Sequence, residues 1–398
     1  MQTSRRTRGV AKALEALSSF FTESAWARRR KEPGVCDFAF GNPQEWPLPQ
    51  LVEALRSHAV PENKDWFAYK ANEQETCAVI AEALGQKLGL PFEAEDIAVT
   101  NGAFAALALA FHLLTDPGDE VVFSVPPWFC YEALIIASGG VAVKVPVSVP
   151  GFDLDPDAIG RAITPRTRIV IINSPHNPTG RVYSSEVLAR LAAVLEAASR
   201  RNGRPIWLLS DECYREIVFD GLGFRSPASV YPHTLIAYSY AKKLLTPGER
   251  IGYLAIAPAC PDRRQLRDAV FPMQSACGWC FADALLQHSI REFEALSIDV
   301  DRLQHKRDRM VDALTGIGYE VHKPEGTFYL LPRAPVSDDI SFARSLADRD
   351  VFILPGSICE LPGYFRISLT ATEDMIERSL PIFAEAFADH VAIATGAP

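Results

Sequence analysis

The sequence lacks long apolar runs. A segment that crosses a bilayer needs roughly 18–20 consecutive apolar residues, and no stretch here reaches that length. The best candidate, residues 104–114, is short and contains His112. The basic N-terminus has no continuous apolar core and no cleavage site, so we expect neither a secretory signal nor a membrane anchor. Its Arg-rich start resembles a mitochondrial transit peptide, but Glu15 and Glu23 favour a surface helix.

Cysteine and positive charge are also scarce. Eight cysteines in 398 residues are too few for a disulfide framework, which favours a reducing, cytoplasmic location. The close pair Cys277-Gly-Trp-Cys280 has no second pair with which to bind zinc, and we interpret it as two core thiols. With 40 Lys and Arg against 49 Asp and Glu, the net charge is −9, which disfavours nucleic acid as a partner.

Several catalytic motifs are missing as well. The sequence has no Walker phosphate loop, no H-E-x-x-H and no G-x-S-x-G, and Gly221-Leu-Gly223 lacks a third glycine. Its histidines do not cluster at metal-ligand spacing, so we expect no metal site. Chemistry that depends on a cofactor but not on a metal is therefore the class of function that remains plausible.

From about residue 97, short β-rich runs alternate with helical stretches. This alternation predicts βαβ units, and therefore an α/β fold with a mainly parallel sheet and helices on both faces. The expected strands are residues 97–100, 120–124, 141–147, 168–173, 206–210, 235–239 and 251–256. The expected helices are residues 74–89, 103–114, 129–138, 155–163 and 184–200.

The two ends of the chain differ from this central part. Residues 9–31 predict one helix, and residues 283–316 predict a long charged helix. A smaller α+β segment follows, with strands expected near residues 319–322, 326–331 and 364–369. The N-terminal piece is too short to be a domain of its own. We therefore predict a large domain of residues 45–285 and a small discontinuous domain of residues 1–44 and 286–398.

A lysine follows directly after an apolar strand in Ser239-Tyr-Ala-Lys242-Lys-Leu-Leu. Burying an ammonium group is costly, and where it occurs a lowered pKa and Schiff-base chemistry become possible. A pair of solvated loop lysines fits this segment equally well.

Two polar segments also follow predicted strands. Asn173-Ser-Pro-His-Asn177-Pro-Thr-Gly180 and Ser210-Asp211-Glu-Cys-Tyr214 begin where ligands of open α/β sheets bind. Asp211 is suited to pair with a ring nitrogen of a cofactor, or alternatively to cap a helix. The first segment alone also fits an ordinary polar turn.

Taken together, these segments resemble the class I/II aminotransferases, the fold-type I enzymes that use pyridoxal 5′-phosphate (PLP). The resemblance runs from Gly41 to beyond Arg366, and several separated motifs match in order. It implies a homodimeric enzyme that moves an amino group between an L-amino acid and a 2-oxo acid by a ping-pong mechanism. It also implies a PLP-transferase fold of type I, with a small α+β domain made from both chain ends.

The resemblance assigns the catalytic roles residue by residue. Lys242 matches the lysine that forms the Schiff base and moves the proton; Lys243 misses the spacing to Ser239 and Arg250 by one. Asp211 matches the acid that keeps the pyridine nitrogen protonated. The remaining ring contacts match Asn177 and Tyr214 at the phenolic oxygen and Trp128 on the ring face.

The resemblance also implies phosphate and substrate contacts. Backbone N–H groups of Gly102, Ala103 and Phe104 lie at a helix N-terminus, which is suited to an anion, and Ser239 and Arg250 match the side-chain phosphate ligands. A further set of residues matches the substrate contacts: Gly41, Trp128, Asn177 and Arg366, of which Arg366 binds the α-carboxylate.

The sequence departs from the family pattern at two places. Ala241 and Lys243 stand where a second serine and a threonine are usual. The tyrosine that one subunit often lends to its partner's phosphate site aligns with Phe67, with Tyr69 nearby. The aromatic residues between 65 and 72 nevertheless suggest an interface.

Several other interpretations remain open at this point. A PLP enzyme that catalyses elimination or oxidation with O₂ would share the same residues. A PLP-sensing regulator would need a DNA-binding domain, for which the part before Gly41 is too short, and an inactive scaffold would not need these residues intact. Trp46, Trp128 and Phe67 suggest a partly aromatic pocket without choosing the substrate.

Overall fold

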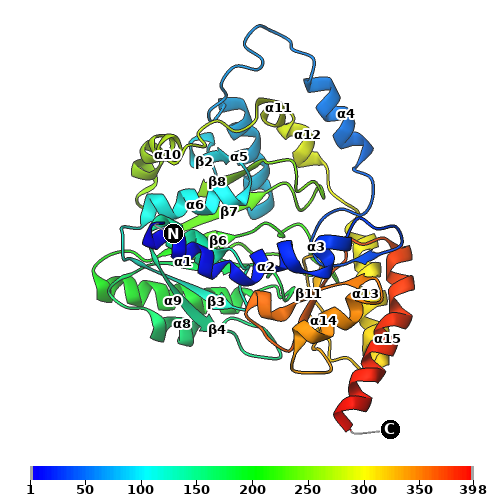
Figure 1. Cartoon of the computed structure of the whole chain (residues 1–398). Helices are drawn as coiled ribbons and strands as arrows, with labels where there is room; N and C mark the ends of the chain where they lie inside the picture. The colour runs from blue at the N-terminus through cyan, green and yellow to red at the C-terminus, as the bar shows by residue number, and fades with distance from the viewer. Residues whose placement is uncertain (1–2, 396–398) are drawn as a thin grey trace.

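A seven-stranded sheet forms the centre of the computed structural model, which describes residues 3–395 and side chains as far as residue 391 (Figure 1). The strand order is β2-β8-β7-β6-β5-β3-β4, and β8 alone runs antiparallel to its neighbours. The strands are β2 (Ile97–Thr100), β3 (Glu120–Val125), β4 (Val141–Pro146), β5 (Thr167–Asn173), β6 (Trp207–Asp211), β7 (Thr234–Ser239) and β8 (Gly252–Ile256). The predicted mainly parallel sheet is confirmed.

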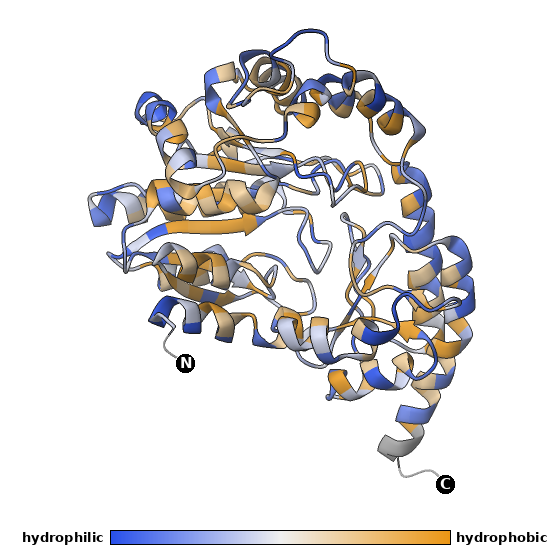
Figure 2. Ribbon diagram, turned by 45° about the horizontal axis from the view of Figure 1, so that its top comes forward, coloured by the Kyte–Doolittle hydropathy of each residue, from blue (hydrophilic) through white to orange (hydrophobic). Residues whose placement is uncertain are grey.

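Alternate residues of each strand face opposite layers of helices. Ile169 and Ile171 pack toward one layer, whereas Val170 and Ile172 pack toward the other. The first layer contains α6 (Ala103–Leu114), α7 (Tyr131–Ser138) and α10 (Arg263–Cys277). The second contains α8 (Pro156–Ala162) and α9 (Ser185–Asn202), with α5 (Gln74–Leu88) and α12 (Ile290–Ala295) beside β2, β7 and β8. Both faces are therefore covered, and the central strands are strongly hydrophobic (Figure 2).

The carboxyl ends of three parallel strands carry polar side chains to one edge of the sheet. Asn173 ends β5, Asp211 ends β6 and Ser239 ends β7, and Asn173 lies opposite Asp211 in the pairing register. The sheet therefore assembles a polar cluster from segments far apart in the chain.

The two chain ends pack together beside this edge. β1 (Cys36–Asp37) pairs in parallel with β10 (Val351–Phe352), and the backbone N–H of Ser368 donates to the carbonyl of Phe38 at 2.9 Å. The remaining elements here are the sheet β11 (Leu354–Pro355), β12 (Phe365–Ser368) and β9 (Tyr329–Leu330), with helices α13 (Val300–Ile317), α14 (Asp339–Ala347) and α15 (Glu373–Thr395). This pairing agrees with a small domain built from both ends, whose boundaries at residues 44 and 286 stay a prediction.

The N-terminal segment is not one helix, contrary to the expectation for residues 9–31. It forms α1 (Arg5–Ala13), α2 (Glu15–Glu23) and α3 (Ala25–Arg29), which run from α7 toward α14 (Figure 1). Ser24 adopts an extended conformation, and its hydroxyl accepts from the N–H of Ala27. It thereby ends α2 and caps α3. No residue of α1 or α2 is buried, as a surface position requires.

The expected helix at residues 283–316 is also divided. It consists of α11 (Ala284–His288), α12 and α13, with the break before α13 at Asp299. The Asp299 carboxylate accepts from the N–H of Arg302 and begins a new helix. Another helix, α4 (Pro49–His58), lies outside the sequence prediction.

Two further expectations are wrong. Within the described residues no strand forms at 319–322, because Tyr319 follows the glycine that ends α13 and buries its ring against Phe383 and Phe387. Cys277 and Cys280 are unpaired thiols but are only partly buried, at the end of α10. None of the described helices is long and apolar enough to cross a membrane.

Gly180 tests the packing of the polar edge against the C-terminal segment. Its φ is +74°, and a Cβ there would collide with Pro324 and the carbonyl of Gly326. We expect Gly180→Ala to lower the free energy of unfolding by about 3 kcal/mol or more, from backbone strain plus overpacking. Urea denaturation measures this loss.

Gly203 supplies the matched control, since its φ is +66° and the space that a Cβ would take there has no neighbouring atom within 4 Å. Gly203→Ala should cost about 1 kcal/mol, from strain alone. Equal losses at the two positions would contradict the tight approach at Gly180.

Candidate active site

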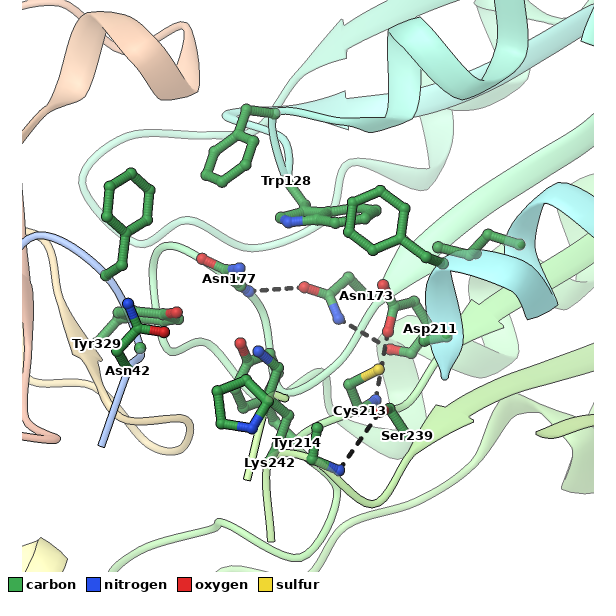
Figure 3. Close-up of a pocket in the computed structure, with 18 of the residues that line it drawn as sticks. Asn42, Trp128, Asn173, Asn177, Asp211, Cys213, Tyr214, Ser239, Lys242 and Tyr329 are labelled. Atoms are coloured by element: carbon green, nitrogen blue, oxygen red, sulfur yellow. Dashed lines mark hydrogen bonds between the residues drawn. The ribbon is translucent and has the colours of Figure 1, made fainter. Parts of the chain in front are cut away.

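A cavity of about 350 Å³ opens at the polar edge of the sheet (Figure 3). Most of the predicted site residues line it: Gly41, Ala103, Phe104, Trp128, Asn177, Asp211, Tyr214, Ser239, Lys242, Arg250 and Arg366. Gly102 does not line the cavity but lies directly behind it, where a Cβ would meet the Arg250 guanidinium. Trp128 lies on the opposite side of the cavity from Lys242 and Tyr214. The structure thus brings all the predicted residues together.

The two adjacent lysines have different surroundings. The Lys242 amine lies in the cavity, 5.6 Å from the centre of the Tyr214 ring. Lys243 is 1% exposed, and its amine lies 3.0 Å from a Glu216 carboxylate oxygen and donates to the carbonyl of Glu294 at 3.0 Å. Lys243 is therefore held away from the cavity, and Lys242 is free to react there.

Asp211 is a buried carboxylate that faces the cavity. Burial raises its pKa, and a hydrogen bond from the Tyr131 hydroxyl at 2.7 Å opposes this effect. The backbone N–H of Cys213 donates to the other carboxylate oxygen at 3.3 Å, and no helix begins here for Asp211 to cap. A carboxylate with a raised pKa in a closed site favours a cationic partner.

Tyr131 is a site residue that the sequence did not assign. It lies three residues after Trp128, at the start of α7, and its ring packs edge-on against the indole at 5.3 Å between ring centres. The same short segment therefore supplies an aromatic wall and a hydrogen bond to Asp211. Its position three residues after Trp128 is the feature of the sequence that could have indicated this role.

A hydrogen-bonded chain joins the sheet edge to the C-terminal segment. The Asn173 side chain accepts from the backbone N–H of Asn177 at 2.7 Å, and Arg366 donates to the side-chain Oδ1 of Asn177 at 3.1 Å. Arg366 is 1% exposed, donates to the carbonyl of Ala39 at 3.0 Å and stacks 4.0 Å from the Tyr329 ring centre. Its Nε has no hydrogen-bond partner among the described residues. Such a buried, unsatisfied guanidinium is suited to an anionic ligand.

A second part of the cavity lining, around Arg250, is also arranged for an anion. Gly102, with φ +77°, directly precedes α6 and lies against the Arg250 guanidinium, so the free N–H groups at the start of that helix lie close to this cation. Arg250 donates to the carbonyls of Pro247 at 2.9 Å and Asn101 at 3.3 Å, and burial lowers its pKa. Ser239 completes this part of the lining. A phosphate group fits these donors.

The aromatic lining differs in part from the expectation. Trp128 lines the cavity, but Trp46 is 96% exposed and Phe67 is 55% exposed, and neither lines it. Other aromatic residues, which the sequence did not single out, lie in the wall instead: Phe40, Phe129 and Tyr329. Within residues 3–395, no group of three or more His, Cys, Asp or Glu side chains is arranged to hold a metal ion.

Comparison with known proteins identifies the family. The family model for class I and II aminotransferases matches residues 33–381. The chain belongs to this family. Its members use PLP, and the chain is accordingly an aminotransferase of fold type I.

Individual relatives agree over nearly the whole chain. The aspartate/prephenate aminotransferase of Thermus thermophilus is 32% identical over 395 residues, which cover 95% of this chain and 98% of that protein. An aminotransferase structure from Eubacterium rectale superimposes with a TM-score of 0.86 at 32% identity, covering 98% of this chain and 96% of the other. N-succinyldiaminopimelate aminotransferase from Mycobacterium tuberculosis gives a TM-score of 0.81 at 26% identity, covering 97% and 100%.

Glu216 tests the ion pairs that hold Lys243 away from the cavity. Burial raises the Glu216 pKa, but Lys243, Lys87 and Arg215 lower it more, to about 2. A carboxyl pKa below its usual value stabilises the fold above pH ~4.5, and this contribution is lost as the pH falls toward 2. Glu216→Gln should therefore lower the free energy of unfolding at neutral pH by about 3 kcal/mol.

The difference from the unchanged protein should shrink between pH ~4.5 and 2, measured as melting temperature at each pH. Glu75→Gln is the control, since Glu75 is 88% exposed and its ion-pair partner is 3.7 Å away. A constant difference at all pH values would show that Glu216 acts through packing and not through its charge.

Proposed function

We propose that this aminotransferase works through PLP bound covalently to Lys242, in two half-reactions that move an amino group from an amino acid to a 2-oxo acid. One observation carries the proposal: Lys242, Asp211 and Arg366, from three distant segments, face the same 350 Å³ cavity. The relatives' names give different substrates for those proteins, so family membership alone does not choose one here.

The residues of the cavity fit the cofactor. Arg250, Ser239 and the start of α6 are suited to the phosphate, and Trp128 is placed to cover the ring. Asp211 is buried and lacks a cationic partner within hydrogen-bond distance among the described residues, as a protonated ring nitrogen would require. When bound, PLP supplies an electron sink for the bond that breaks at the substrate's α-carbon.

The chain's own groups then perform the remaining tasks. The Lys242 amine, once released from the cofactor, is placed to take the α-proton and return it. Burial raises the pKa of the Tyr214 hydroxyl, and the neighbouring Tyr329 raises it further, so Tyr214 stays protonated and donates a hydrogen bond. Asn177 is suited to donate beside it from its side-chain amide.

Arg366 orients the amino acid. Its free Nε and the unused N–H groups of its guanidinium form a fork that matches the substrate's α-carboxylate. The stack on Tyr329 and the hydrogen bonds to Asn177 and Ala39 fix the plane of this fork. The carboxylate would therefore be held in one orientation.

Elimination or oxidation of an amino acid would use the same residues. The two outcomes differ in the fate of the cofactor, since transamination leaves it aminated and absorbing in the near ultraviolet. Adding one amino acid without a 2-oxo acid separates them. The PLP-loaded protein is expected to be yellow. Persistent loss of this colour supports transamination, whereas return of the colour with release of ammonia supports elimination or oxidation.

The attachment site gives a direct prediction. Borohydride reduction of the protein after incubation with PLP should fix the cofactor on Lys242, because Lys243 is buried in its ion pairs. Peptide mapping measures the labelled position. Lys242→Ala should still bind PLP without covalent attachment and should lose turnover. A label on Lys243, or none on either residue, would overturn the assignment.

We also propose a homodimer in a reducing, cytoplasmic location. All eight cysteines are free, which supports such a location.

The aromatic segment around residue 67 supports the homodimer. Trp66 packs within its own chain, 3.7 Å from His288 between ring centres, but Phe67 is 55% and Tyr69 is 86% exposed. Tyr69 packs against Phe281, which is also exposed, at 4.8 Å between ring centres, and such exposed aromatic rings are typical of an interface. Phe67 and Tyr69 are the candidates to reach the partner's phosphate site.

Mixed dimers test this sharing of sites. One subunit carries Lys242→Ala, and the other carries Phe67→Ala with Tyr69→Ala. If the sites are shared, the hybrid keeps one site made wholly from unaltered residues, although both parent dimers have little activity. We expect about half of the unaltered activity per hybrid dimer, with sedimentation confirming its mass. A fully active monomer, or a hybrid no better than its parents, would contradict the arrangement.

A further inference from the structure

We propose that the amino donor of this site has a large apolar side chain, aromatic or branched aliphatic, and not a second carboxylate. The inference rests on the proposed function and names its substrate class. The charges and the apolar wall of the cavity carry it.

The first observation concerns the capacity of Arg366. Two of its N–H groups already donate to Asn177 and Ala39, and its Nε is unpaired. The groups that remain suit one carboxylate bound side-on. The α-carboxylate, which every amino acid carries, occupies this position and leaves no second fork for a dicarboxylic substrate.

The second observation concerns the other positive charges. Among the described lining residues, the remaining Lys and Arg side chains are Lys242 and Arg250. Arg250 is held at the start of α6 by the carbonyls of Pro247 and Asn101, at the phosphate end. Lys242 is bound to the cofactor before the substrate arrives and, once released, has to be uncharged to take the α-proton. A second substrate carboxylate therefore finds no cation from this chain.

The third observation is the apolar wall that aromatic lining residues form beside these charged groups. Phe129 lies 5.8 Å from the Arg366 guanidinium carbon, measured to the ring centre. Phe104 is 46% exposed and packs edge-on against Trp128 at 4.6 Å. The substrate side chain beyond the α-carbon therefore meets aromatic surface.

Phe40 stiffens this wall from behind. Its ring stacks on Phe21 at 4.9 Å with 10° between the planes, and Trp26 packs edge-on at 5.0 Å. Helices α2 and α3 thus hold a lining residue in place, and the wall cannot easily turn aside to admit water. A carboxylate buried against it would lose hydration without a partner, whereas an apolar side chain would gain contact.

A panel of single half-reactions on the PLP-loaded protein tests the preference. We expect the second-order rate constant for amination of the cofactor to be at least about tenfold higher with L-phenylalanine or L-leucine than with L-aspartate and L-glutamate. Aspartate or glutamate as the best donor would overturn the inference and leave the proposed function intact, and would point to a cation from a second copy of the chain. If no donor aminates the cofactor, the proposed function itself fails.

Equilibrium binding gives a readout that does not depend on turnover. Calorimetric titration should show 3-phenylpropanoate binding at least about tenfold more tightly than succinate, since both offer one carboxylate to Arg366 and differ in the far end. Tighter binding of succinate would overturn the inference, whatever the donors do.

Phe104 offers a matched pair of variants, since it is half exposed and lies in the wall. Phe104→Lys places a cation where we expect the side chain to lie, and should shift the ratio of succinate to 3-phenylpropanoate affinity toward succinate by about tenfold. Phe104→Leu keeps the wall apolar and should preserve the order of affinities. A ratio that is unchanged by Lys, or changed equally by Leu, would show that the substrate side chain does not meet this wall.

Discussion

The parallel alignment of β5, β6 and β7 is the constraint on which the site depends. Parallel strands in register end at the same edge, so Asn173, Asp211 and Ser239 meet although long helical segments separate them in the chain. The antiparallel β8 then places Gly252 opposite Ser239, which brings the preceding Arg250 to the same edge. Sheet topology, more than any local motif, gathers the polar groups.

Arg366 completes this edge from the other part of the structure. It is buried on β12, yet its hydrogen bonds go to Asn177 in the loop after β5 and to Ala39 after β1. A guanidinium without its full set of partners is costly to bury, unless a ligand supplies the missing acceptor. Arg366 therefore has two properties at once: it joins the two parts of the chain, and it keeps a free N–H that suits a carboxylate.

The sequence predicted the central strands well, because each is a short apolar run followed by turn or polar residues. Most of the residues it assigned to the site line one cavity, because their spacings match a family pattern, whereas their roles stay predictions. It could not divide residues 9–31 or 283–316, since helical periodicity continues across Ser24 and Asp299 and only the local backbone shows the breaks. The sequence analysis placed Trp46 in the pocket, which is wrong, and it overlooked Phe40. Both errors have one reason, because composition does not show which aromatic side chain points into the cavity.

The adjacent lysines show how a buried network can determine which side chain reacts. Glu216 and Glu294 are not among the cavity's lining residues, and they bind Lys243 and Lys87 together. Lys243 is held by these carboxylates, and its neighbour faces the cavity instead. Lys242 then meets Tyr214 and Phe328 and the open cavity. The ion pairs lie outside the cavity lining, and they hold the residue next to the amine that faces the cavity.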